Sequence, residues 1–260
     1  MSRRWREAAA SLAPLLALPL LAACAAGGVA ARQDPATLPG TGDGPAVVDA
    51  AVGASETVGA GTDDALRDAW PQILYTTALR RGAVFYNFGI PGATVAQALD
   101  EEVPAALAVR PDLVTVWLNV NDLIQGVPPA LYEEQLGRLI HALRRGGAAR
   151  VLVANTPWLD RLPAYLACLP DATPTGADCL LAGAAVPPPQ QLDALVDAYN
   201  AAIDRVVARE GAVLVDLHSF GEVPALHPED VSGDGFHPSD TGHRAIAAAF
   251  AAALRRSGGG

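Results

Sequence analysis

The sequence contains no lysine, so all 18 of its basic residues are arginine, and 28 acidic residues leave a formal net charge of −10 at pH 7. A chain this acidic has little of the positive surface with which proteins bind nucleic acid or anionic lipid by charge. It also has only three cysteines, no cluster of histidines at metal-ligand spacing and no glycine-rich phosphate loop. These absences argue against a nucleic-acid partner, a bound metal and a nucleotide-binding loop.

Hydrophobic residues, by contrast, make up 51% of the 260 positions. This apolar fraction excludes disorder along the whole chain. A chain of this length can bury one large core, whereas two full domains would be cramped.

The N-terminal segment has the polarity of an export signal. Three arginines among the first six residues precede an apolar stretch over 8–23, which two prolines interrupt and which is short for a membrane span. The stretch ends in Leu21-Ala22-Ala23-Cys24, which resembles the lipobox of bacterial lipoproteins. The resemblance implies that the signal peptide over 1–23 is removed and that Cys24 carries a diacylglyceryl group. The protein is then extracytoplasmic and anchored to a bacterial membrane by this lipid alone. An ordinary signal peptide cleaved nearby, with Cys24 incidental, is the alternative.

The segment after Cys24 differs in composition from the rest of the chain. Residues 24–44 are rich in Gly, Ala, Pro and Thr and show no apolar period, so we predict a flexible tether before a domain over 45–260. Cys168 and Cys179 are the two cysteines of that domain. Outside the cytoplasm such a pair is typical of a disulfide, and no histidine or further cysteine lies near them in sequence to complete a metal site.

From residue 45 onward, short apolar runs alternate with longer amphipathic segments. The short runs predict strands over residues 46–52, 83–87, 112–118, 150–154 and 212–217. The longer segments predict helices over residues 63–81, 95–108, 129–145, 190–210 and 240–256. Buried strands joined by helices predict an α/β fold, a three-layer α/β/α sandwich around a five-stranded parallel sheet. The carboxyl ends of its strands then lie along one edge, where ligand and catalytic groups are expected.

Residues 158–189 do not fit this alternation. The segment holds both domain cysteines and three consecutive prolines, and long loops in compact domains are usually functional or disordered. We predict a disulfide-stapled, lid-like insertion beside the active edge. Four of its apolar side chains are candidates either to line an acyl or sugar pocket or simply to pack the insertion onto the domain: Trp158, Leu162, Tyr165 and Leu166.

Four short blocks fall at the expected active edge. They are Gly53-Ala54-Ser55-Glu56-Thr57, Asn87-Phe88-Gly89-Ile90-Pro91-Gly92-Ala93, Asn119-Val120-Asn121-Asp122 and Asp234-Gly235-Phe236-His237-Pro238. Each alone is a weak signal, but their joint order resembles the SGNH (GDSL-type) hydrolase family, whose name lists its Ser, Gly, Asn and His. The resemblance covers about residues 45–256 and implies the flavodoxin-like fold of that family.

The resemblance, together with the chemistry of these side chains, implies their roles. Ser55 becomes a nucleophile once His237 takes its proton, and Asp234 holds the imidazole in the required tautomer. By the same resemblance, the oxyanion hole is formed by the backbone N–H groups of Ser55 and Gly89 and by the side-chain amide of Asn121.

Two positions depart from the family pattern. Ala54 stands where the first block of the family has an Asp that mainly braces the loop, and Asn119 stands where the third block usually begins with Gly. Neither change removes a predicted catalytic group. Asn119 leaves the conformation of its loop open, although Asn tolerates unusual φ better than most residues.

Other polar residues have competing interpretations. His227 also precedes a proline, but the family order places Asp before His, which favours His237. His243, early in the last predicted helix, is expected to face solvent or to pair locally. Asp122 is expected to brace the active loop by hydrogen bonding, and Asp216, at the end of a strand, to be structural.

These residues predict a serine esterase that forms an acyl-enzyme on Ser55, acts on an ester substrate and needs no cofactor or metal. We expect a monomer. The substrate stays open between acetylated saccharides and short- or medium-chain acyl esters: a small polar cleft would favour the first, and an apolar trough under the insertion the second. A catalytically inactive SGNH-fold binding module and an acyltransferase that uses the same acyl-enzyme are the alternative functions.

Overall fold

The computed structural model describes residues 47–171, 177–179, 186–219 and 228–256 of the chain. The predicted signal peptide over 1–23, the lipobox with Cys24, the tether over 24–44 and His227 lie outside the described residues. The first described element is a strand that begins at Val48.

Five parallel strands form one sheet in the order β2-β1-β3-β4-β5. The strands are β1 (Val48–Gly53), β2 (Val84–Asn87), β3 (Leu113–Trp117), β4 (Arg150–Ala154) and β5 (Val213–Val215). All five predicted strands are therefore present and parallel. β5 is shorter than the predicted run over 212–217, because Asn155 Oδ1 accepts hydrogen bonds from the backbone N–H groups of Leu217, at 2.6 Å, and His218, at 3.0 Å. These bonds turn the chain out of the sheet after Val215.

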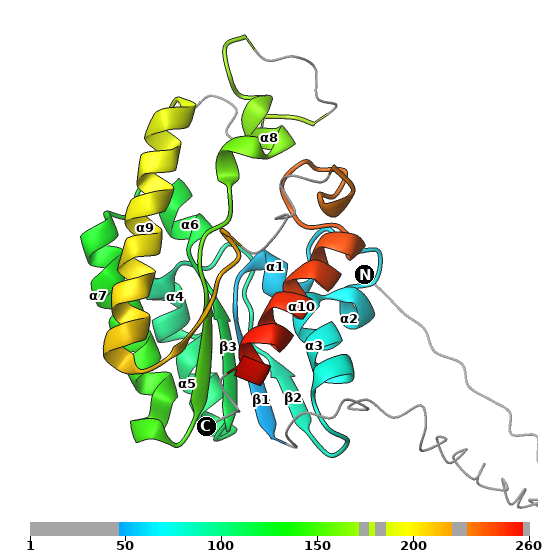
Figure 1. Cartoon of the computed structure of the whole chain (residues 1–260), viewed down its shortest axis with the longest axis vertical. Helices are drawn as coiled ribbons and strands as arrows, with labels where there is room; N and C mark the ends of the chain where they lie inside the picture. The colour runs from blue at the N-terminus through cyan, green and yellow to red at the C-terminus, as the bar shows by residue number, and fades with distance from the viewer. Residues whose placement is uncertain (1–46, 172–176, 180–185, 220–227, 257–260) are drawn as a thin grey trace, which may run out of the picture. The chain divides into compact units, whose positions relative to one another are not determined.

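Helices connect the strands and follow the last one. In chain order they are α1 (Ser55–Val58), α2 (Ala65–Asp68), α3 (Trp70–Ala78), α4 (Val95–Asp100), α5 (Glu102–Ala108), α6 (Val120–Ile124), α7 (Pro129–Arg144), η2 (Arg145–Gly147), η3 (Leu159–Arg161), α8 (Pro163–Leu166), α9 (Pro189–Glu210), η5 (Pro228–Asp230) and α10 (Asp240–Arg256). Figure 1 shows α7 and α9 on one side of the sheet and α3 and α10 on the other.

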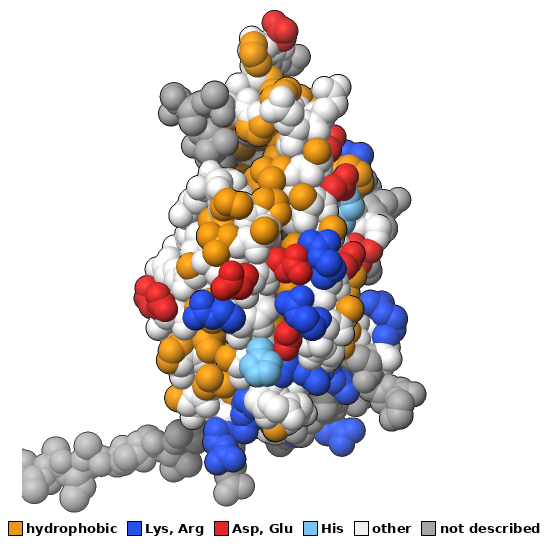
Figure 2. All heavy atoms as spheres, turned by 90° about the vertical axis from the view of Figure 1, so that its left-hand side faces the viewer, with side chains coloured by type: hydrophobic (Ala, Val, Ile, Leu, Met, Phe, Trp, Pro, Cys, Tyr) orange, Lys and Arg blue, Asp and Glu red, His pale blue; other side chains and the backbone are white. Residues whose placement is uncertain are grey.

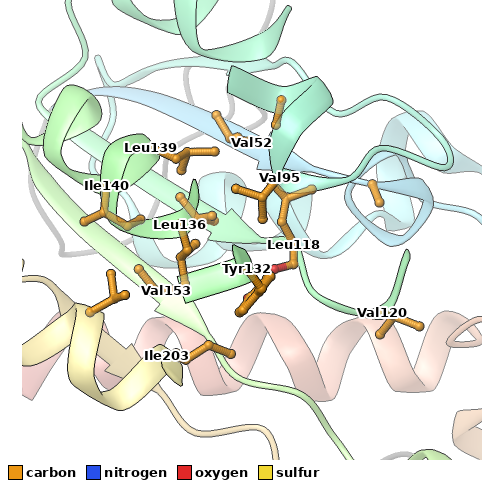
Figure 3. Close-up of a cluster of buried hydrophobic side chains, with 14 of the residues drawn as sticks. Val52, Val95, Leu118, Val120, Tyr132, Leu136, Leu139, Ile140, Val153 and Ile203 are labelled. Carbon is orange, nitrogen blue, oxygen red and sulfur yellow. The ribbon is translucent and has the colours of Figure 1, made fainter. Parts of the chain in front are cut away.

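Each face of the sheet packs against its own layer of helices. On β3, Val114 and Val116 belong to a core shared with α4, α7 and α9. Leu113 and Trp117 of the same strand belong to a second core, shared with α3 and α10. This alternation buries both faces, as a parallel sheet covered by crossover helices requires. Figure 3 shows part of the first core, including Leu136, Ile140, Val153 and Ile203. The predicted three-layer α/β/α fold is confirmed.

Two predicted helices are each divided in the structure. The segment over 63–81 forms α2 and α3, because Ala69 between them is extended, with φ −61° and ψ 138°. The break places Pro71 in the first turn of α3, where its missing N–H costs no hydrogen bond. The segment over 95–108 divides at Glu101 into α4 and α5, with Pro104 in the first turn of α5. The prediction of unbroken helices was wrong at both places for the same reason: each proline lies in the first turn of a new helix.

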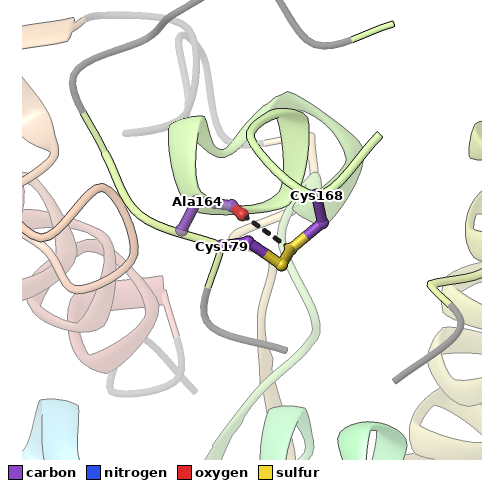
Figure 4. Close-up of a disulfide and its surroundings, with 3 residues drawn as sticks. All are labelled: Ala164, Cys168 and Cys179. Atoms are coloured by element: carbon purple, nitrogen blue, oxygen red, sulfur yellow. Dashed lines mark hydrogen bonds between the residues drawn. A yellow bond between two sulfur atoms is a disulfide. The ribbon is translucent and has the colours of Figure 1, made fainter. Parts of the chain in front are cut away.

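The insertion over 158–189 contains η3 and α8 before α9 begins at Pro189. Its two cysteines form the predicted disulfide, with Cα atoms 4.7 Å apart. Cys168 Sγ also lies 3.2 Å from the carbonyl oxygen of Ala164 in α8 (Figure 4). The disulfide therefore ties Cys179 to the end of α8.

The surface of α7 and α9 carries charged side chains among apolar ones, as Figure 2 shows. Glu133 of α7 accepts a hydrogen bond from Arg205 of α9 at 2.7 Å and lies 3.4 Å from Arg209. Exposed pairs of this kind add little to the free energy of unfolding. Within the described ranges, no helix is long and apolar enough to cross a membrane.

Candidate active site

Ser55 is the first residue of α1, and only Ala54 separates it from the end of β1. Gly53, two residues earlier, permits a close approach: a Cβ there would clash with Thr57 Oγ1 and lie 2.9 Å from the carbonyl oxygen of Trp117. The tight turn from strand to helix therefore requires glycine at this position.

A buried carboxyl group from α5 holds this turn. Glu102 Oε2 accepts a hydrogen bond from the backbone N–H of Gly53 at 2.7 Å. Burial raises the pKa of Glu102 to about 8, although the bond from Gly53 lowers it. The loop around Ala54, which has no aspartate of its own, is thus braced by a neutral acid from another helix. Sequence reasoning missed Glu102, because nothing in the local sequence connects α5 to the turn.

The three predicted catalytic side chains are joined in a row by two hydrogen-bonding contacts, with His237 in the middle. His237 Nε2 lies 3.1 Å from Ser55 Oγ, across 182 positions of sequence. On the other side of the imidazole, His237 Nδ1 lies 2.6 Å from Asp234 Oδ2. A nucleophile, a base and a group that orients the base at these distances form a relay able to move a proton from Ser55 to His237.

Asp234 is held as a carboxylate. Burial raises its pKa, but the bond to His237 and three further hydrogen bonds outweigh burial and bring the pKa to about 2. Asp234 Oδ1 accepts these bonds from Ser232 Oγ at 2.7 Å, Phe236 N–H at 2.8 Å and His237 N–H at 3.0 Å. An ionised Asp234 favours the tautomer with the proton on Nδ1, which leaves Nε2 free to accept the proton of Ser55.

The turn that carries Asp234 and His237 packs against the insertion. Ala164 N–H donates a hydrogen bond to the carbonyl oxygen of Gly235 at 3.0 Å. Gly235 has φ +75°, and a Cβ there would lie 2.6 Å from Ala177 Cβ. Since Ala177 and Cys179 are close in sequence, the disulfide-linked insertion supports the histidine loop directly. The insertion thus contacts the turn that precedes His237.

The predicted oxyanion donors follow the ends of three neighbouring strands. The N–H of Gly89, after β2, already donates to Asn87 Oδ1 at 3.0 Å. The side chain of Asn121, after β3, donates one amide hydrogen to the carbonyl oxygen of Ala93 at 3.1 Å. Asn121 therefore keeps a second amide hydrogen for a ligand, whereas the single hydrogen of Gly89 is engaged.

The third block is shaped by its two flanking polar residues. Asp122 is buried, and its two oxygens accept hydrogen bonds from the N–H of Val95 at 3.2 and 3.1 Å. Burial raises its pKa to about 6. The prediction that Asp122 braces this loop is confirmed. Asn119 has φ −164°, an extended conformation that needs no glycine, and its side chain donates to the carbonyl oxygen of Ala154 at 3.3 Å.

His243 differs from its predicted position. It is fully buried, its Nδ1 accepts a hydrogen bond from the N–H of Trp70 at 3.1 Å, and its Nε2 lies 3.0 Å from the carbonyl oxygen of Ala60. Burial lowers its pKa, so the ring is neutral with the proton on Nε2. The expectation of a solvent-facing side chain was wrong because α10 packs on α3. Asp216 is structural as predicted: it accepts a hydrogen bond from the side chain of Asn155 at 2.8 Å.

Two apolar pockets are lined in part by residues next in sequence to Ser55 and His237. The first, of about 50 Å³, includes Glu56, next to Ser55, in its lining. The second, of about 180 Å³, lies between α6, the insertion and the start of α9. The two pockets share part of their lining and so are neighbours: Val120, Leu159, Leu162 and Phe236.

The insertion supplies much of this lining. Trp158 lines the first pocket, Tyr165 the second and Leu162 both. Leu162 and Tyr165 also belong to the buried core, and Leu166 only packs against it. The apolar side chains of the insertion therefore both line the pockets and pack the insertion onto the domain. Sequence reasoning missed Glu56, Val120 and Phe236, although each of them stands next to a predicted site residue.

The described residues contain no group of three or more His, Cys, Asp or Glu side chains placed to hold a metal ion.

A family model described as the GDSL-like lipase/acylhydrolase family matches residues 51–245, well over half of the chain. The chain belongs to this family. The matched range includes all four blocks of the sequence, so the resemblance to SGNH hydrolases is confirmed.

An arylesterase from Vibrio mimicus is 29% identical to this lipase/acylhydrolase family member over 101 residues, which are 38% of this chain and 50% of that protein. The chain thus matches about half the length of this curated relative.

Solved structures of the same architecture resemble this family member in fold. The crystal structure of TesA has a TM-score of 0.60 and 21% identity, covering 80% of this chain and 98% of that one. The psychrotrophic esterase EstA from Pseudoalteromonas sp., in a structure inhibited by monoethylphosphonate, has a TM-score of 0.59 and 14% identity, covering 82% of this chain and 99% of that one. At these identities both similarities show the fold.

Proposed function

We propose that the protein hydrolyses carboxylic esters through an acyl-enzyme on Ser55. The observation that carries this proposal is the relay from Ser55 Oγ to His237 Nε2, at 3.1 Å, and from His237 Nδ1 to Asp234, at 2.6 Å. Membership of the lipase/acylhydrolase family supports the same reaction class.

The reaction begins when Ser55 Oγ attacks the ester carbonyl carbon and His237 Nε2 takes its proton. The tetrahedral intermediate then collapses, the carbon–oxygen bond to the alcohol breaks, and His237 returns the proton to the departing alkoxide. Water, activated by the same imidazole, attacks the acyl-enzyme and releases the acid and free Ser55. Asp234 stays ionised throughout and stabilises the imidazolium.

The negative oxygen of the intermediate needs hydrogen-bond donors. The N–H of Ser55, at the start of α1, and the second amide hydrogen of Asn121 are the donors that this site offers. Gly89 joins them once its N–H leaves Asn87. Each such donor typically contributes about 10²–10³ to the rate.

The pockets favour esters with apolar acyl groups over acetylated saccharides. The second pocket is lined almost wholly by apolar side chains and is larger than an acetyl group needs. Each methylene buried there would stabilise the bound ester by about 0.8 kcal/mol, or about fourfold in kcat/KM. We therefore propose short- and medium-chain acyl esters, aryl esters among them, as substrates.

Intact-mass measurement after fluorophosphonate treatment tests the nucleophile. The full chain should gain one adduct, and Ser55→Ala should gain none and lose about 10⁴-fold or more in kcat/KM on a p-nitrophenyl ester. EstA, of the same fold, is inhibited by a phosphonate. A folded wild-type chain without an adduct would favour the inactive binding module. Product analysis with an added sugar acceptor then separates hydrolysis from acyl transfer.

We also propose that the enzyme works outside the cytoplasm, anchored through Cys24. The lipobox-like sequence before Cys24 and the disulfide between Cys168 and Cys179 both support this location.

A further inference from the structure

Glu56 is a second carboxyl group in contact with the nucleophile. It directly follows Ser55 on α1, its side chain is only 8% exposed, and its Oε2 lies 3.4 Å from Ser55 Oγ. The hydroxyl of Ser55 therefore has two neighbours, His237 Nε2 at 3.1 Å and the carboxyl of Glu56. The reaction outlined above uses only the first.

The surroundings of Glu56 favour its neutral form. Its side chain lines the first pocket with Trp117, Val120 and other apolar residues, and among the described residues of that lining Asp230 alone is also ionisable. Burial raises the pKa of Glu56, and the charge of Asp234 raises it further. The backbone N–H of Glu56, the charge of His237 and the Ser55 hydroxyl oppose this rise only in part.

The single proton of the Ser55 hydroxyl decides what each form of Glu56 does. A neutral Glu56 can donate its own proton to Ser55 Oγ, so the serine proton stays directed at His237 Nε2. An ionised Glu56 can only accept, so the serine proton turns toward Glu56 and away from the base. Its negative charge also opposes the charge that develops on the substrate oxygen.

We propose that Glu56 is a positioning residue, which directs the Ser55 hydroxyl to His237 while it carries a proton and diverts that hydroxyl once it is ionised. This inference rests on the proposed role of Ser55 as nucleophile.

The groups that face Glu56 come from three parts of the chain. Ser55 contacts it from α1, His237 and Asp234 act on it from the loop before α10, and Asp230 of η5 lines the same pocket. Among these groups, Glu56 is the one whose ionisation would define the alkaline side of the activity profile.

The pH dependence of kcat/KM for a p-nitrophenyl ester tests this role in the full chain. Wild type should give a bell-shaped profile that falls about tenfold for each pH unit beyond its upper midpoint. Glu56→Gln, which keeps a donor and cannot ionise, should keep the acid side and lose the alkaline fall. Glu56→Leu should also lose the alkaline fall, at a lower plateau because it has no donor.

Two matched variants separate Glu56 from other buried acids. Asp49→Asn and Glu102→Gln each remove a carboxyl whose pKa lies at about 8, and both should keep the alkaline fall. An alkaline fall that persists in Glu56→Gln, or one that disappears in Glu102→Gln instead, overturns the proposal. Fluorophosphonate labelling of Ser55 tests the esterase proposal independently of the pH profile. If the folded wild-type chain is not labelled, the proposed esterase function is wrong, whatever the role of Glu56.

Discussion

The carboxyl groups around the active edge differ in pKa: hydrogen bonds keep Asp234 ionised, whereas burial raises the pKa of Asp122 and, further, that of Glu102. Asp234 collects four hydrogen bonds, and its pKa lies at about 2. Glu102 accepts one bond from Gly53 and Asp122 accepts from Val95, and burial keeps their pKa values at about 8 and about 6. The balance between burial and the donors aimed at each carboxyl therefore sets its pKa.

Asp234→Asn should lower kcat/KM by about 10⁴-fold at neutral pH with little change in melting temperature. An amide can donate to His237 Nδ1, which places the imidazole proton on Nε2 and blocks the transfer from Ser55. Ser232→Ala removes only one bond to Asp234 and should cost less than about tenfold. Steady-state kinetics on both variants decide the matter, and equal losses would contradict this role for Asp234.

Asp49→Asn should remove a pH dependence of folding. Asp49 is fully buried in β1, and burial raises its pKa from 3.8 to about 8, against the lowering effect of the Ala50 N–H. The unfolded chain releases this proton near pH 4 while the folded chain keeps it, so stability is greatest below pH 4 and declines as the pH rises toward 8. Relative to wild type, the variant should gain on the order of a few kcal/mol between pH 4 and pH 7. Urea unfolding at both pH values measures the gain, and a difference that is the same at the two pH values would be evidence against it.

Among the structural elements, the insertion contacts both the second pocket and the loop that carries His237. α8 donates to Gly235 through Ala164, and Cys168 and Tyr165 line the second pocket. The same short segment thus lines the proposed acyl pocket and supports the turn that carries His237.

The double variant Cys168→Ser and Cys179→Ser should lose selectivity for longer acyl chains. A cross-link over 11 positions contributes about 2–3 kcal/mol in the chain-entropy model, so the melting temperature should also fall. The kcat/KM for octanoate should drop more than that for acetate, because the pocket wall loosens. Wild type treated with a reductant is the matched control. If the ratio of kcat/KM for the octanoate ester to that for the acetate ester does not change, the disulfide does not influence the proposed acyl pocket.

For the whole molecule, net charge and anchoring are linked. A chain of net charge −10 gains nothing from anionic lipid, so the proposed membrane attachment would rest on the acyl chains at Cys24, at about 0.8 kcal/mol for each buried methylene.

Cys24→Ser should therefore release the protein from the membrane fraction of expressing cells, because serine cannot form the thioether. Cys168→Ser leaves Cys24 intact and should stay with the membranes. Cell fractionation followed by detection of the protein measures how much of each variant stays with the membranes. Retention of Cys24→Ser in the membrane fraction would count against the lipid anchor.

The amino-acid sequence alone determined the alternation of strands and helices, because buried strands and amphipathic helices leave local apolar patterns. The five strands, the helices α7, α9 and α10 and the four active-edge blocks are all readable in this way. The breaks at Ala69 and Glu101 were missed, since an amphipathic pattern continues across them.

Tertiary structure alone decided what each polar side chain contacts. His243 and His237 lie six positions apart, yet one is buried against Trp70 and the other meets Ser55. Three further features likewise depend on which surfaces meet: the hydrogen bond from the Gly89 N–H to Asn87, the hydrogen bond from the Gly53 N–H to Glu102, and the burial of Glu56. Burial and hydrogen-bond partners are properties of packed elements, so they set the pKa values and roles that no local pattern contains.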